Sequence, residues 1–119
     1  MEIISRYNIP DPVKSWWQII NSLGSYILLW VIMVKTIDIS YWLTLGLSVF
    51  AAGFMVRTFI IFHDCGHGSF FKSAKLNRIV GIVTGFVVFT PFHKWTHDHK
   101  VHHQTVGNLD KRGIGDVKT

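Results

Sequence analysis

Residues 61–71 read IFHDCGHGSFF, and they stand where a long apolar segment ends and a basic, polar region begins. Within them, His63 and His67 are four positions apart. On an α-helix, residues i and i+4 lie on the same face, so both imidazoles can point at one metal ion. One such pair is weak evidence by itself, and the prediction of a metal site depends on further histidines later in the chain.

A second histidine cluster at residues 99–103, HKVHH, has spacings of three and four that also fit a helical face. Five of the seven histidines therefore fall into two groups with ligand spacing. Imidazoles suit iron, zinc, copper or nickel. Five are too many for one tetrahedral zinc ion and too few for a complete dinuclear site. We predict that metal is bound by His63, His67, His99, His102 and His103.

The other residues near the clusters are expected to be supporting groups. His93 and His97 are predicted to be non-ligands, because neither fits the ligand spacing. Asp64 and Asp98 are each adjacent to a candidate ligand. Each carboxylate can orient an imidazole through its second nitrogen, or it can be a solvated interfacial group. Cys65, the one cysteine, allows no intrachain disulfide and is expected to be a small hydrophobic residue.

The composition is that of a small membrane protein. Hydrophobic residues make up 49% of the 119 positions, and charged residues make up 16%. Two apolar spans are predicted, at residues 16–37 and 41–62. Together with the break between them they hold only three charged residues, Lys35, Asp38 and Arg57. At ~1.5 Å per residue, each span is long enough to cross a hydrocarbon core of ~30 Å.

A short polar break separates the two spans, so they are expected to form an antiparallel transmembrane hairpin. Residues 1–15 are expected to be a polar cytosolic lead without a continuous helix, because Pro10 and Pro12 interrupt it. Arg57, inside the second span, has two interpretations. Its side chain snorkels to the interface, or the helix leaves the bilayer near it and carries the first histidine pair into the cytosol.

A third apolar run, Ile79 to Phe92, ends at Thr90-Pro91 and is too short for a full crossing. A re-entrant or interfacial helix is the better interpretation, because it keeps both histidine clusters on one side. Residues 104–119 are expected to be a loop. The predicted fold is an all-α membrane protein: a two-helix transmembrane hairpin, a short re-entrant or interfacial helix, and cytosolic histidine-bearing helices within residues 63–119.

The net charge of +5 comes mainly from the region after residue 71. A basic region can bind nucleic acid. Beside long apolar segments it instead indicates the cytoplasmic face of a membrane with anionic lipids, so no nucleic-acid partner is expected. Because positive residues also precede the first span, the positive-inside rule places the histidines in the cytoplasm.

These stretches resemble the membrane fatty acid desaturases. Residues 63–70, HDCGHGSF, look like the first histidine box of that family, and residues 99–103 match its second box, H-x-x-H-H. The stretch Thr90-Pro91-Phe92 and Trp95 resemble the family's approach to the second box. Residues 107–117 resemble the segment after that box in bacterial members. The resemblance therefore implies a multi-pass protein of the bacterial inner membrane.

By this likeness the fold is a bundle of membrane helices under a cytosolic cap, with two irons held by three histidine boxes. The resemblance makes all five predicted metal ligands iron ligands. The implied reaction uses O₂ and two electrons from a ferredoxin- or cytochrome b5-type donor. It removes hydrogens from two adjacent methylenes of a lipid acyl chain and leaves a double bond. The basic cytosolic face suits an acidic electron donor.

The sequence departs from the family in one respect, because no histidine follows His103 and the third box is missing. The iron ligand set is therefore incomplete, and these residues alone are not expected to desaturate an acyl chain. We expect a fragment, a truncated reading frame, or a split gene whose missing C-terminal half supplies the rest.

Other functions stay open. A membrane fatty acid hydroxylase or ketolase shares such boxes. A non-catalytic membrane hairpin that binds metal or a partner needs no third box. Residues 63–67 also mimic the zinc peptidase motif H-E-x-x-H, with Asp64 in the place of glutamate, but that motif does not require the second cluster.

Overall fold

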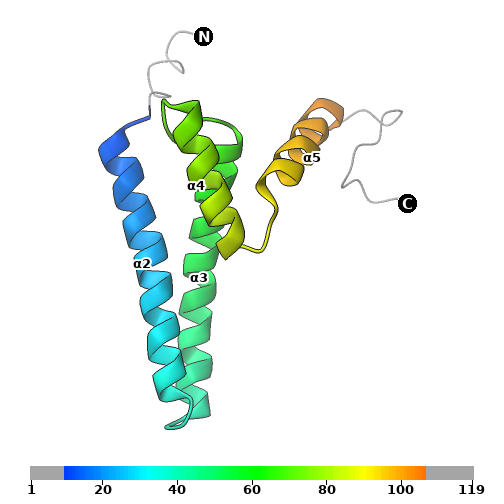
Figure 1. The fold of residues 1–119 in the computed structure, drawn as a ribbon. Helices are drawn as coiled ribbons and strands as arrows, with labels where there is room; N and C mark the ends of the chain where they lie inside the picture. The colour runs from blue at the N-terminus through cyan, green and yellow to red at the C-terminus, as the bar shows by residue number, and fades with distance from the viewer. Residues whose placement is uncertain (1–9, 107–119) are drawn as a thin grey trace, which may run out of the picture.

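The computed structural model describes residues 10–106, and within that range the chain forms helices and no strands (Figure 1). The predicted all-α fold is confirmed. The helices are α2 (Pro12–Thr36), α3 (Tyr41–Gly66), α4 (Ala74–Val87) and α5 (Phe92–Thr105).

Helix α2 begins earlier than the sequence predicted. The carboxylate of Asp11 caps it by accepting hydrogen bonds from the backbone N–H groups of Val13, at 3.0 Å, and Lys14, at 3.4 Å. Pro12 fits the first turn, because an N–H at that position would have no partner inside the helix. The expectation of a non-helical lead through residue 15 is thus wrong for residues 12–15, and residues 1–9 lie outside the described range.

Helices α2 and α3 run antiparallel to each other, side by side, as the predicted hairpin (Figure 1). Both are long and apolar enough to cross a membrane. The side chain of Ser40 caps α3 by accepting a hydrogen bond from the N–H of Leu43. At the same turn, the hydroxyls of Thr36 and Thr44 are 3.1 Å apart and join the two helices.

Helix α3 continues four residues past the predicted end at residue 62, and it ends at Gly66. His63 is therefore in its last turn, and His67 is the C-cap. The guanidinium of Arg57 lies over the ring of Phe54, 5.8 Å from its centroid. The helix is uninterrupted past Arg57, which is compatible with both interpretations of this residue, so both stay predictions.

The third apolar run is not one helix. Helix α4 starts at Ala74, capped by the hydroxyl of Ser73, and ends at Val87, and α5 starts at Phe92 at an angle of 102° to it. Phe89 in the connection has a φ of 54°, which is rare for a residue with a side chain. The bent pair has the geometry of a broken span or a re-entrant loop, so the predicted re-entrant arrangement stays a prediction, while the boundaries of the predicted helix are corrected.

Helix α4 runs back along the end of α3 that carries the histidines, and α5 then turns away from it (Figure 1). Residues 104 and 105, expected to be loop, form the end of α5. They extend the helix because the backbone ladder continues to Val106, whose N–H bonds to the carbonyl of His102 at 2.8 Å. The remainder of the predicted loop, residues 107–119, lies outside the described residues.

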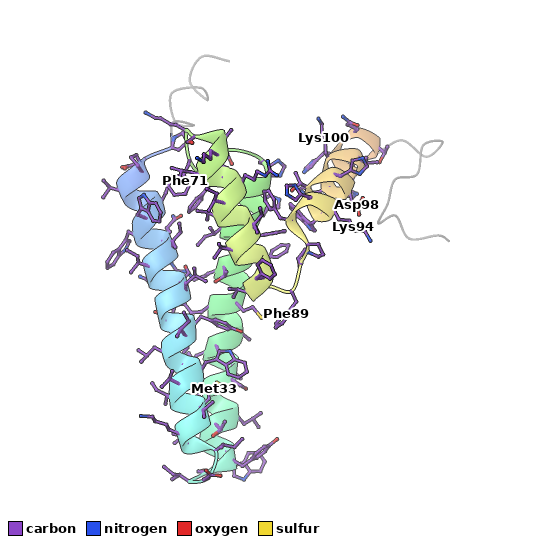
Figure 2. The ribbon with its side chains drawn as sticks, in the orientation of Figure 1. Met33, Phe71, Phe89, Lys94, Asp98 and Lys100 are labelled. Carbon is purple, nitrogen blue, oxygen red and sulfur yellow. The ribbon has the colours of Figure 1, made fainter. Side chains whose placement is uncertain are left out.

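The buried core lies at the histidine end of the hairpin. Helix α4 and the connection before it supply part of the core, and Figure 2 shows Phe71 beside α4 on the side of α2. Cys65 is buried there, as expected of a small hydrophobic residue. The core consists of Ile61, Cys65, Phe70, Phe71 and Val80.

Two polar side chains hold the connection between α3 and α4. Asn77 is buried, and its amide forms two hydrogen bonds with the backbone of Phe71: the N–H of Phe71 donates at 2.8 Å, and its carbonyl accepts at 2.7 Å. The hydroxyl of Ser15 donates to the carbonyl of Phe70 at 2.8 Å. The connection that follows His67 is thus attached to both α2 and α4.

Candidate metal centre

The end of α3 presents the first histidine pair. The backbone N–H of His67 bonds to the carbonyl of His63 at 3.1 Å, which places the second ring one turn beyond the first. Gly68 then takes a φ of 70°, in the left-handed region that favours glycine, and the helix stops. The two Nε2 atoms are 3.3 Å apart. The predicted convergence of this pair is therefore present in the structure.

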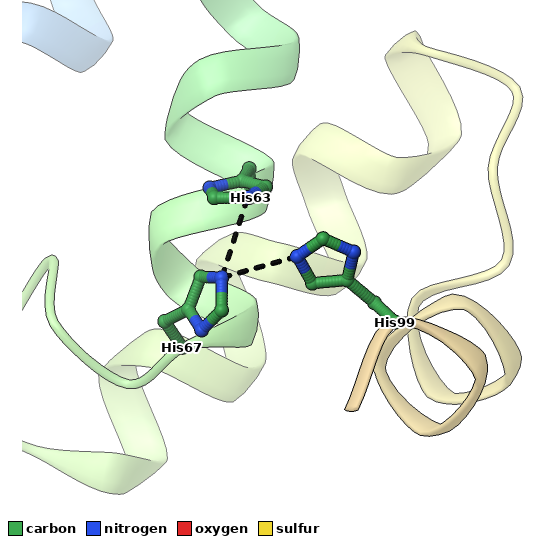
Figure 3. Close-up of side chains that lie close together, drawn as sticks. All are labelled: His63, His67 and His99. Carbon is green, nitrogen blue, oxygen red and sulfur yellow. Dashed lines mark hydrogen bonds between the residues drawn. The ribbon is translucent and has the colours of Figure 1, made fainter. Parts of the chain in front are cut away.

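Helix α5 brings the second cluster to the first. The Nε2 atom of His99 lies 3.1 Å from Nε2 of His67 (Figure 3). On the next turn of α5, Nε2 of His103 lies 3.0 Å from Nε2 of His99. One nitrogen from each of His63, His67 and His99 thus faces the same small space, although the rings come from two helices, and the nitrogen of His103 lies next to that of His99.

These separations fit a single metal ion. Metal–imidazole bonds of about 2.0–2.1 Å put neighbouring ligand nitrogens about 3 Å apart in an octahedral site and slightly farther apart in a tetrahedral one. The ligand atoms of His63, His67 and His99 all lie within 4.8 Å of one another. A set of imidazoles is suited to iron, zinc, copper or nickel. The residues present can therefore hold a metal of this class.

His102 does not join this cluster. Its ring centroid is 6.3 Å from that of His99 and 6.1 Å from that of His103. On a helix, residues i+3 and i+4 lie on opposite sides of residue i, because each residue turns the chain by about 100°. His102 therefore occupies the other flank of α5, half-buried, where its ring is available to a different group.

The two predicted carboxylates are in different positions. Asp64 lies beside a clustered ring, with Oδ1 3.2 Å from Nδ1 of His63. Asp98 instead lies beside His97, at 3.4 Å from Nδ1. Within the described residues, Asp64 thus contacts a candidate ligand, whereas Asp98 contacts a histidine that was not expected to be one.

His93 and His97 lie outside the cluster, in agreement with their spacing, and both are exposed. His93 lines an apolar cavity of about 460 Å³ between α4 and α5, together with Phe86, Phe89 and Phe92. Figure 2 shows Phe89 at the bend between these helices. A second cavity, of about 370 Å³, lies over the cluster itself and is lined by Gly66, His67, Trp95, Thr96, His99, Lys100 and His103.

The surroundings favour neutral imidazoles. Burial lowers the pKa of His67, the positive charges that His63 and His103 carry when protonated lower it further, and Asp64 opposes this. Burial and the neighbouring histidines, His103 first among them, likewise lower the pKa of His99. A neutral imidazole has a free lone pair, which is the form that binds a metal.

Trp95 is the residue of the site whose part the sequence did not reveal. Its indole lies almost parallel to the imidazole of His99, with ring centroids 4.3 Å apart and planes at 16°. Its other neighbours are on α3, where it contacts the rings of Phe62 and His63. A signal was present, because Trp95 and His99 are four residues apart and share a helix face.

Comparison with known proteins gives a consistent result. The sequence model of the fatty acid desaturase family matches residues 40–114. A fatty acid desaturase from Bacillus subtilis (strain 168) is 45% identical over 114 residues, which cover 96% of this chain and 32% of the relative. No solved structure matches the chain.

Plant proteins are also similar. An endoplasmic reticulum omega-3 fatty acid desaturase from Nicotiana tabacum is 36% identical over 86% of this chain and 26% of its own length. A chloroplastic sn-2 acyl-lipid omega-3 desaturase (ferredoxin) from Helianthus annuus is 32% identical over 91% of this chain and 24% of its own length. The chain thus spans about a third or less of the length of these relatives.

Proposed function

Because this chain belongs to the fatty acid desaturase family, we propose that it provides part of an iron site that introduces a double bond into the acyl chain of a membrane lipid, using O₂. The observation that carries the proposal is the convergence of imidazole Nε2 atoms from α3 and α5 at separations of 3.0–3.3 Å. This arrangement uses both histidine boxes. A zinc peptidase motif at residues 63–67 would not require the second box, so the arrangement favours the desaturase proposal.

In this proposal, one iron is held by His63, His67, His99 and His103, and His102 faces a second iron from the other flank of α5. The bound iron supplies the activation of O₂ and the removal of hydrogen from the acyl chain. The protein's own side chains orient the ligands and set their protonation. Asp64 accepts a hydrogen bond from Nδ1–H of His63, which leaves Nε2 free for the metal.

The proposed acyl chain approaches along the bend between α4 and α5. The cavity there is apolar and opens beside Phe86 and Phe89, whose side chains are 78% and 84% exposed. Aromatic side chains that are this exposed are suited to contact with lipid. The cavity and the histidine cluster are both lined by residues of α5, which supports the approach of a substrate from the bilayer.

We also propose that the histidine end lies in the cytoplasm and receives electrons from an acidic carrier of the ferredoxin or cytochrome b5 type. The start of α2, the histidine end of α3 and the second cluster lie toward one end of the hairpin (Figure 1). Exposed basic residues surround this end, and Figure 2 shows Lys94 and Lys100 on α5. One relative carries ferredoxin in its name. Positive charge near the site favours docking of an acidic protein.

Five histidines are too few for a complete di-iron site, so we propose that ligands outside these 119 residues complete it. The chain corresponds to about a third of the Bacillus subtilis relative, which leaves room for such ligands in a protein of that length. The 119 residues alone are then expected to bind metal and to form no double bonds.

A chimera tests this proposal. Residues 1–119 replace the matching segment of the Bacillus subtilis relative, and the fatty acids of a host strain are measured by gas chromatography. The chimera is expected to produce unsaturated acyl chains, and its His63→Ala variant is expected to produce none. A His97→Ala variant is the matched control and should keep the activity, because His97 is exposed and lines neither the cluster nor the cavity. Unsaturation that survives His63→Ala, or a purified chimera that holds zinc instead of iron, overturns the proposal.

A further inference from the structure

Helix α5 meets α3 through one large side chain. The indole of Trp95 contacts the ring of Phe62 at 4.8 Å and that of His63 at 5.6 Å, measured between centroids. It also lies edge-on to Phe59, at 5.9 Å. These partners, Phe59, Phe62 and His63, all lie on the side of α3 that faces α5. Trp95 is therefore placed to set the distance and the tilt of α5 relative to the histidine-bearing end of α3.

Gly66 makes this approach possible. A Cβ atom added at Gly66 would lie 2.9 Å from Cζ3 of Trp95, which is closer than side-chain carbons normally come. The absence of a side chain at this position thus lets the six-membered edge of the indole reach the backbone of α3. The glycine lies directly before His67, so the indole edge touches the helix where the first histidine pair ends.

The face of the same indole supports His99. Its plane is within 16° of the imidazole plane at a centroid distance of 4.3 Å, which is a stacked arrangement. A metal-binding histidine usually has its ring orientation fixed by a hydrogen bond to its second nitrogen. His63 has such a contact with Asp64, whereas within residues 10–106 the contacts of His99 with hydrogen-bonding groups are at Nε2.

We propose that Trp95 is a positioning residue of the metal centre, which fixes the imidazole plane of His99 by stacking, as Asp64 fixes that of His63 by a hydrogen bond. The indole of Trp95 lies between Gly66 and His99, and in this position it directs Nε2 of His99 toward Nε2 of His67. This inference rests on the proposed metal-binding role of the histidines and adds to it an orienting device that involves no hydrogen bond.

The test measures Co²⁺ binding to the full 119-residue chain, purified in detergent with a histidine-free tag. Co²⁺ reports its coordination geometry through its visible absorption spectrum. Trp95→Leu is expected to weaken Co²⁺ binding by about 10–100-fold, the usual effect of removing a group that orients a ligand, and to alter the spectrum. Trp95→Phe keeps an aromatic face and is expected to restore most of the affinity and the original spectrum.

Trp17→Leu is the matched control. Trp17 is 64% exposed on α2, so this substitution is expected to leave Co²⁺ affinity and the spectrum unchanged. Equal affinity and an unchanged spectrum for Trp95→Leu overturn the positioning role alone. If the unaltered chain binds Co²⁺ no better than its His67→Ala variant, the metal site itself is overturned, and the role of Trp95 with it.

Circular dichroism of each variant separates positioning from folding. If Trp95→Leu loses helix content, Gly66→Ala is the second variant, because its methyl group displaces the indole without removing it. Gly66→Ala is then expected to weaken Co²⁺ binding at unchanged helix content. An unchanged affinity in that variant overturns the inference.

Discussion

The Nε2 atoms of His67 and His99 lie 3.1 Å apart, although 32 positions separate them in the sequence. His67 is fixed by the end of α3, and His99 lies in the middle of α5. The contact forms only if the connection after His67, helix α4 and the bend before α5 all have the correct geometry. Metal binding is therefore a sensitive measure of the structure of this whole region.

Replacement of His67 by alanine is expected to remove most of the metal from the chain. His67 lies between the other rings, because its Nε2 atom contacts Nε2 of both His63 and His99. His97→Ala is the matched control on α5, since His97 is exposed and outside the cluster. Inductively coupled plasma mass spectrometry of chains purified from bacterial membranes gives the metal content, and equal content in both variants contradicts the proposed ligand set.

Acidification of the metal-free chain is expected to separate α5 from α3. The pKa values of His67 and His99 are below the ordinary value of 6.5 in the folded chain. A separated or unfolded state, with ordinary pKa values, takes up protons first as the pH falls. The stability that the neutral histidines give to the packed state of α3 and α5 is thus fully present above pH 6.5. It is lost as the pH falls through the lowered pKa values of His67 and His99.

Spin labels measure this separation. One label is placed at residue 69, after α3, and the other at residue 104, at the end of α5, in a Cys65→Ala background. Both positions are exposed, so the labels should not disturb the core. The distance is expected to increase below pH 6.5 in this background and to stay constant with pH when His67 and His99 are both glutamine. The same pH response in the glutamine variant contradicts the assignment to these histidines.

The sequence was sufficient for the features that depend on local pattern. The length of the two apolar segments predicts the hairpin, because a membrane-spanning helix needs about 20 apolar residues. The spacing of His63 and His67 predicts that their rings converge, because the period of the helix is fixed.

The second cluster followed its expectation only in part. Residues 99–103 were expected to act as one group, but helix geometry separates His102 from His99 and His103.

The features that were missed depend on capping and on contacts across the fold. The start of α4 lies at Ala74, before the apolar run, because the hydroxyl of Ser73 caps a first turn that carries the exposed Lys75. The contact between Gly66 on α3 and Trp95 on α5 joins two helices. A pattern read along one helix cannot reveal such a pair, because each residue alone is compatible with many partners.

Asn77→Ala is expected to lower the free energy of unfolding by about 1–3 kcal/mol, because it leaves buried backbone groups of Phe71 without partners. Asn77 is 3% exposed and makes both hydrogen bonds with Phe71. Ser69→Ala, on the same connection, removes an exposed hydrogen bond to the carbonyl of Asp64 and should cost less than about 0.5 kcal/mol. Reversible unfolding in mixed detergent micelles measures both variants, and equal losses contradict the assigned role of Asn77.

Gly85→Ala is expected to disrupt the bend between α4 and α5. A Cβ atom at Gly85 would lie 2.7 Å from the backbone carbonyl oxygen of Thr90 and 3.2 Å from the ring of Phe62. Neither neighbour can move easily, because Thr90 is held by a hydrogen bond from its own N–H to the carbonyl of Gly85 and Phe62 is fully buried. Overpacking of this kind costs about 1–3 kcal/mol.

Gly53→Ala, on α3, is the matched control for this prediction. A Cβ atom at Gly53 meets no other atom within 4 Å, so alanine should stabilise the helix by roughly 0.5–1 kcal/mol. The two substitutions are therefore expected to change the free energy of unfolding in opposite directions. Gly85→Ala should also weaken Co²⁺ binding, because the bend sets where α5 places His99 opposite His67. Unchanged stability and Co²⁺ affinity in Gly85→Ala would show that α5 reaches the cluster independently of this bend.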